Sequence, residues 1–114
     1  MEIETQTCAN TLCLTIVADR IDAAGVIHFK DRVLAEIEAA TSPRVILDLN
    51  QVGFVDSSGL GGIVSIMKHL GTDKRLDLCA LTPTVTKVFR LTRMDSVFHI
   101  YASLDIALQD ADAA

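Results

Sequence analysis

The spacing of apolar residues changes repeatedly along this chain, between the period of two typical of strands and the spacing of three or four typical of helices. Between these segments lie connections of only a few residues. Strand spacing occurs at Leu12–Val17, Leu76–Ala80 and Val97–Tyr101, and helical spacing at Ala23–Ala40, Leu60–Leu70, from Thr82-Pro83 onward and through Ser103–Gln109. In the first helix the apolar stripe is Val26, Phe29, Val33 and Ile37. The segment Arg44–Leu49 is apolar on both faces apart from Asp48, which predicts a central strand covered by helices on both sides. This alternation predicts an α/β domain with a mixed, mostly parallel sheet of four to five strands and about four helices.

Several residues mark the expected ends of these elements. A short strand at Ile3–Thr7 would join the next one through a hairpin turn at Ala9-Asn10. Asp22 is a suitable N-cap for the first helix, which should end at the Thr41-Ser42-Pro43 run. Gly71 should end the second helix.

Length and charge limit the class of protein. With 114 residues, of which 50% are hydrophobic, the chain should form one domain over residues 1–114, with a frayed tail at 110–114. Ten basic against fifteen acidic residues give a net charge of −5, which disfavours nucleic acid as a partner. No apolar run approaches the roughly 20 residues of a membrane span, and Glu2 and Glu4 oppose a signal peptide. We expect a cytoplasmic protein without membrane insertion.

Neither cysteine nor histidine spacing indicates a disulfide framework, a metal site or a cofactor. The three cysteines, Cys8, Cys13 and Cys79, contain no Cys-x-x-Cys pair and are expected to be reduced. The three histidines lie in separate segments, at His28, His69 and His99.

The segment Asp56-Ser57-Ser58-Gly59 follows a predicted strand and precedes a helix, at the sheet edge where α/β domains usually carry their sites. One interpretation is structural, with Ser57 or Ser58 serving as the N-cap. A nucleophile elbow does not fit, because Val55 and Asp56 stand where Gly-x-Ser-x-Gly needs its first glycine. Neither a P-loop nor a dinucleotide fingerprint is complete here.

The same segment offers a hydroxyl at the positive end of a helix. Ser57 could accept a phosphoryl group from another enzyme, and the helix N-terminus would tolerate the added charge of about −1.5 to −2. Next to Asp56, that charge would repel a partner that has to desolvate the surface. Gly59 is expected to leave room for the partner's close approach.

The run Phe54-Val55-Asp56-Ser57-Ser58-Gly59-Leu60-Gly61 closely resembles the signature of bacterial anti-sigma-factor antagonists, which are STAS domains. The resemblance extends over nearly the whole chain, through Ile21-Asp22, the strand before the signature and Ala80-Leu81-Thr82-Pro83. It departs from the family at Asp19, where the turn before Asp22 normally has a glycine.

The resemblance implies that Ser57 is the phosphorylated residue and that the protein is a substrate rather than an enzyme. The implied partners are an anti-sigma factor of the GHKL serine-kinase type, which supplies ATP and magnesium, and a serine phosphatase. Unphosphorylated antagonist would bind the kinase and release a sigma factor. The implied partner-binding residues are Asp22, Asp56, Ser57, Ser58, Gly59, Leu60 and Gly61.

Two other functions remain open from the sequence. Some STAS domains are docking subunits of transporters or lipid-trafficking complexes, and their serine need not be phosphorylated. A serine hydrolase or nucleotide-binding enzyme would need the fold to bring a histidine to Ser57, because none lies near it in sequence.

Overall fold

Strands and helices alternate in the computed structural model, which describes residues 1–110. The elements are β1 (Glu2–Cys8), β2 (Thr11–Val17), β3 (Arg20–Ile21), α1 (Val26–Glu38), β4 (Arg44–Asp48), β5 (Phe54–Val55), α2 (Ser57–Leu70), β6 (Arg75–Cys79), α3 (Pro83–Leu91), the 3-10 turn η1 (Met94–Ser96), β7 (Ile100–Tyr101) and α4 (Leu104–Gln109). Of the predicted tail, residues 111–114 lie outside the described part of the chain.

The main sheet has five strands in the order β1-β2-β4-β6-β7. Only the β1–β2 hairpin is antiparallel, and the other three pairs are parallel. The hairpin turns at Ala9, which has a φ of 52°. The predicted fold class, a mostly parallel mixed sheet with four helices, is therefore confirmed.

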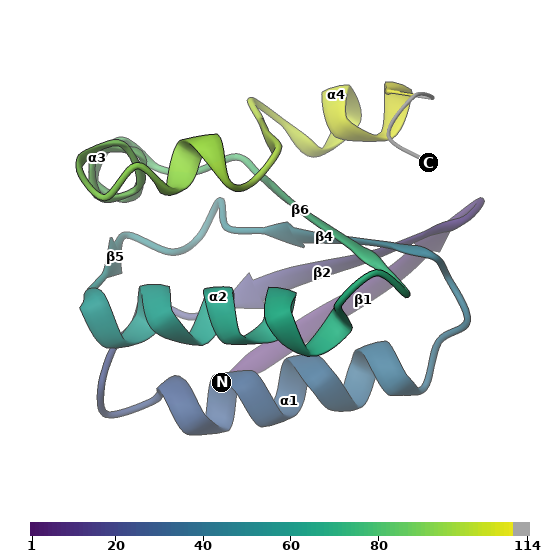
Figure 1. Cartoon of the computed structure of the whole chain (residues 1–114), viewed down its shortest axis with the longest axis horizontal. Helices are drawn as coiled ribbons and strands as arrows, with labels where there is room; N and C mark the ends of the chain where they lie inside the picture. Colours follow the sequence, from purple (N-terminus) through teal and green to yellow (C-terminus); the bar gives the residue numbers. More distant parts are fainter. Residues whose placement is uncertain (111–114) are drawn as a thin grey trace.

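Helices form layers on the two faces of this sheet (Figure 1), with α1 and α2 on one side and α3 and α4 on the other. Every residue of β4 is buried, as expected for a central strand covered on both faces. From α1 the buried residues are Phe29, Val33 and Ile37, so the predicted apolar stripe of this helix faces the core.

The first helix begins later than the sequence predicts. Its N-cap is Gly25 rather than Asp22. The carbonyl of Asp22 accepts hydrogen bonds from the amides of Gly25 (3.1 Å) and Val26 (2.8 Å), and its Oδ1 accepts from Gly25 (3.3 Å). Asp22 therefore stabilises a turn ahead of α1, because its acceptors satisfy the amides before the helix proper starts.

Short strands account for the other differences. Arg20–Ile21 and Phe54–Val55 pair in parallel as β3 and β5, a second sheet too short to show any periodicity in the sequence. The predicted strand Val97–Tyr101 shrinks to Ile100–Tyr101. Phe98 turns inward and packs edge-to-face on Phe89, with ring centroids 6.1 Å apart, which takes its segment out of strand geometry.

The three cysteines are free thiols in this structure. Two of them are buried on the sheet, and burial is the main cause that raises the pKa of Cys13 to about 11 and that of Cys79 to about 12. Both thiols therefore stay protonated at neutral pH.

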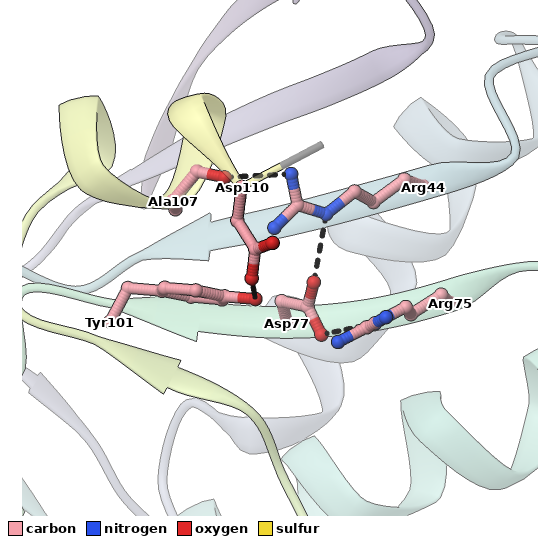
Figure 2. Close-up of polar contacts among 6 residues, drawn as sticks. All are labelled: Arg44, Arg75, Asp77, Tyr101, Ala107 and Asp110. Atoms are coloured by element: carbon pink, nitrogen blue, oxygen red, sulfur yellow. Dashed lines mark hydrogen bonds and ion pairs between the residues drawn. The ribbon is translucent and has the colours of Figure 1, made fainter. Parts of the chain in front are cut away.

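A buried ion pair attaches α4 to the sheet (Figure 2). Arg44 donates from Nε to Asp77 Oδ2 (2.8 Å) and from Nη1 to the carbonyl of Ala107 in α4 (2.9 Å). Its guanidinium lies over the ring of Tyr101, 5.5 Å from the centroid, and the Tyr101 hydroxyl donates to Asp110 Oδ2 (2.7 Å). Polar contacts therefore hold the short final helix in place.

We predict that Asp77→Ala lowers the free energy of unfolding by about 3–5 kcal/mol, because it leaves the buried Arg44 guanidinium without its carboxylate. Arg20→Ala is the matched control. It removes the ion pair with Asp22, in which the Arg20 side chain is 66% exposed, and should lower the free energy of unfolding by less than about 1 kcal/mol. Urea unfolding of both variants measures the difference. Equal losses would contradict the assigned role of the buried pair.

Candidate partner-binding site

The signature segment lies where β5 passes into α2 (Figure 1). Asp56 is the N-cap, with an extended backbone, and its Oδ1 accepts a hydrogen bond from the amide of Gly59 (2.8 Å). The interpretation of Ser57 or Ser58 as the N-cap is therefore wrong. Both serines are the first residues of the helix itself, and both are exposed.

Asp56 also connects two segments that are 33 residues apart. Its Oδ2 accepts a hydrogen bond from the amide of Ala23 (3.1 Å), and its own amide donates to the carbonyl of Ile21 (3.3 Å). The β3–β5 pairing, with Ile21 opposite Val55, sets this register. Asp22 follows directly, so its turn lies beside the start of α2.

Hydrogen bonds from backbone amides lower the pKa of the Asp56 carboxyl, with the Gly59 amide contributing most. No acidic residue lies in the first turn of α2, and the helix spans 14 residues. The N-terminal, positive end of the helix dipole therefore lies at the exposed hydroxyls of Ser57 and Ser58.

The two residues after the serines point inward. A Cβ on Gly59 would collide with the carbonyl oxygen of Ile21, and Leu60 is 8% exposed. The expectation that Gly59 leaves room for a partner is thus corrected: it lets α2 start directly against the β3 backbone. Leu60 belongs to the core, and Gly61 is exposed. Of the seven predicted partner-binding residues, Gly59 and Leu60 are the ones hidden beneath the surface.

Apolar side chains next to the serines escaped the sequence analysis. Ile27 on α1 is 71% exposed and Phe54 on β5 is 42% exposed, and the guanidinium of Arg20 lies 5.7 Å from the Phe54 ring centroid. Ile27 also belongs to a cleft between α1 and α2, which is lined by Val26, Ile27, Lys30, Ser58, Gly61, Gly62 and Ser65. Ile27 is an apolar residue outside the apolar stripe of α1, and this position was the signal by which the sequence could have indicated an exposed contact.

Residues 1–110 contain no cluster of three or more histidine, cysteine, aspartate or glutamate side chains placed to hold a metal ion. Within the same residues, no helix combines the length and apolar character that crossing a membrane requires. The site consists of exposed hydroxyls, carboxylates and apolar side chains, a set suited to contact with another protein.

A family model for the STAS domain matches residues 2–107, and the chain belongs to this family. Among curated relatives, BtrV of Bordetella bronchiseptica, named as a candidate anti-sigma factor antagonist, is 28% identical over 106 residues. The match covers 82% of this chain and 91% of BtrV. The sequence resemblance to STAS antagonists is thus confirmed at the level of the family.

Two solved structures show how widely the fold occurs. The Bacillus anti-sigma factor antagonist SpoIIAA, in its unphosphorylated form, is 20% identical with a TM-score of 0.76, covering 99% of this chain and 98% of SpoIIAA; it has also been solved in a phosphorylated form. A murine anion transporter, Slc26a9, matches with 20% identity and a TM-score of 0.81, covering 96% of this chain and 19% of the transporter. At these identities the likeness concerns the fold alone.

Substitutions at two glycines of one helix should have opposite effects. Gly59→Ala should destabilise the protein by about 1–3 kcal/mol, because the new methyl group collides with the Ile21 carbonyl. Gly61→Ala meets no atom within 4 Å and should stabilise α2 by about 0.5–1 kcal/mol. Thermal unfolding of the two variants checks this. A Gly59→Ala protein as stable as Gly61→Ala would refute the close contact.

The Asp56 cap should make stability depend on pH. Because the folded pKa of Asp56 is lowered from 3.8, its contribution is fully present above 3.8 and is lost as the pH falls below that value. Asp56→Asn should therefore flatten the stability profile between about pH 5 and pH 2. Urea midpoints at several pH values measure the slope, and parallel profiles for the two proteins would exclude this role.

Proposed function

We propose that this STAS protein is an anti-sigma-factor antagonist whose binding to its anti-sigma factor is switched off by phosphorylation of Ser57. One observation carries the proposal. Asp56 supplies the helix cap, so the exposed Ser57 hydroxyl has no structural task at the N-terminus of α2 and is available for modification. The similarity to BtrV supports the assignment of the class of partner.

Phosphorylation at this position would change the surface without unfolding the domain. A phosphoserine adds about −1.5 to −2 charges and three acceptor oxygens, which a helix N-terminus favours. Asp56 is the immediate neighbour, and the Asp22 turn is hydrogen-bonded to it through Ala23. The modified surface would therefore carry several negative charges, and a partner would have to desolvate them to bind.

The proposed partner contacts are the exposed Ser57, Ser58 and Gly61 and the half-buried Asp22 and Asp56, with Ile27 and Phe54 as apolar contacts. Gly59 and Leu60 act from below by holding α2 against β3. Ser58 lines the α1–α2 cleft, whereas Ser57, the proposed phosphoacceptor, is not among the residues that line it.

The protein itself acts as a substrate in this scheme. A GHKL-type serine kinase, which is also the anti-sigma factor, supplies ATP, magnesium and the catalytic base, and a serine phosphatase restores the unmodified form in the cytoplasm. SpoIIAA has this fold and has been solved with and without phosphate, so the fold accommodates both states. A constitutive docking subunit is the alternative, since the same fold occurs within an anion transporter.

A charge introduced at Ser57 tests the switch. Ser57→Asp should weaken binding to the purified anti-sigma factor from the same genome by about a hundredfold or more, because an unpaired charge is buried in the contact. Ser57→Ala should bind normally and should not be phosphorylated when the kinase and ATP are added. Isothermal titration calorimetry and phosphopeptide mapping measure the two effects.

Thr84→Asp is the matched control, because it adds the same charge at the exposed start of α3, in the opposite helix layer. It should bind the anti-sigma factor as the wild type does. Equal affinities of Ser57→Asp and Ser57→Ala would reject the switch and favour the docking subunit. Phosphate found on Ser58 would reject the assigned residue but keep the mechanism.

A further inference from the structure

Charge is unevenly distributed over this acidic protein. The segment 83–97, which contains α3 and η1, has three of the ten basic residues (Lys87, Arg90 and Arg93) and one of the fifteen acidic ones (Asp95). The segment therefore carries +2, and the remaining seven basic and fourteen acidic residues give the rest of the chain −7. The segment 83–97 is therefore positively charged, although the protein as a whole is acidic.

The three cations of this segment are not used internally. Within residues 1–110, the ion pairs involve Arg20, Arg44 and Arg75, and no hydrogen bond from Lys87, Arg90 or Arg93 side chains is present. All three side chains are exposed. They thus keep their full capacity to bind an anionic partner.

The helix geometry groups these cations with an apolar residue. Val85 and Phe89 are the buried residues of α3, and Lys87, Arg90 and Leu91 fall on the opposite side at spacings of three and four. Leu91 is 76% exposed, more than any other large apolar side chain of the described residues. Two grooves lie beside the helix, and Leu81, Thr86 and Arg90 line both of them.

We infer that this α3 surface, defined by Lys87, Arg90, Leu91 and Arg93, docks an acidic amphipathic helical segment of another protein. Carboxylates one helical turn apart would pair with Lys87 and Arg90, and an apolar residue between them would cover Leu91. The surface belongs to the α3–α4 layer, whereas Ser57 starts a helix of the α1–α2 layer (Figure 1). Docking there is consequently independent of the phosphorylation proposed for Ser57.

Two other occupants fit the observations less well. An anionic membrane contacts a broad apolar helix face and would repel the −7 remainder of the chain, whereas α3 exposes a single large apolar residue, Leu91. A second copy would bring its acidic surface to this basic one, a head-to-tail contact that forms a ring if its rotation closes and an open filament if it does not. A short acidic helical segment needs only the three cations and Leu91, so it can contact this surface without lying against the acidic remainder of the chain.

The test uses a synthetic helical peptide of about 15 residues, with glutamates and leucines on one face, and the same peptide with glutamine for glutamate. Titration into the ¹⁵N-labelled protein should shift amide signals of residues 83–97 with the glutamate peptide only. Arg90→Glu and Lys87→Glu should each weaken binding about fivefold or more. Lys68→Glu, on α2, is the matched control and should leave the affinity unchanged.

Several results would overturn the inference. These are equal binding of the glutamine peptide, shifts that map to α1 and α2, or no binding of the glutamate peptide in low salt. Binding to phosphatidylserine vesicles without peptide binding would identify a membrane instead. Sedimentation that shows self-association of the wild type, lost in Arg90→Glu, would identify a second copy.

Wild-type affinity of Ser57→Asp for the peptide would separate this surface from the proposed switch.

Discussion

The carboxylate of Asp56 is the contact on which the candidate site depends. One oxygen caps α2 at Gly59 and the other holds the Ala23 amide, so a single side chain fixes the start of a helix and a distant turn. Because these amides would otherwise lack partners, the two hydrogen bonds satisfy the backbone at the point where the chain emerges at the surface. The serines that follow are thereby relieved of a capping role.

Backbone packing beneath the surface supports this contact. The β3–β5 pair places the Ile21 carbonyl directly under Gly59, where no side chain fits. The helix can therefore begin against the strand, with Ser57 and Ser58 exposed and Gly59 and Leu60 buried. A rigid support of this kind lets a surface change its charge without changing its shape, which a binding switch requires.

The two helix layers give the molecule two different surfaces. The start of α2 combines exposed hydroxyls with carboxylates, while α3 presents cations around an exposed leucine. The buried Arg44–Asp77 pair holds α4 on the same side as α3, so the second layer is fixed by polar contacts as well as by apolar packing (Figure 2). One small domain can thus offer separate faces to separate partners.

The sequence by itself determined the alternation of strands and helices, the central buried strand and the position of the signature, because all of these depend on local periodicity and turn residues. Gly71, Pro83 and Ser103 mark their helix ends correctly for the same reason. Only the tertiary structure decided that Asp56 rather than a serine caps α2, that α1 starts at Val26, and that Gly59 faces inward. The inward position of Gly59 depends on the pairing of β3 with β5, and Asp56 joins the same two segments through the Ala23 amide. These residues are more than 30 positions apart, so their contacts leave no periodic trace in the sequence.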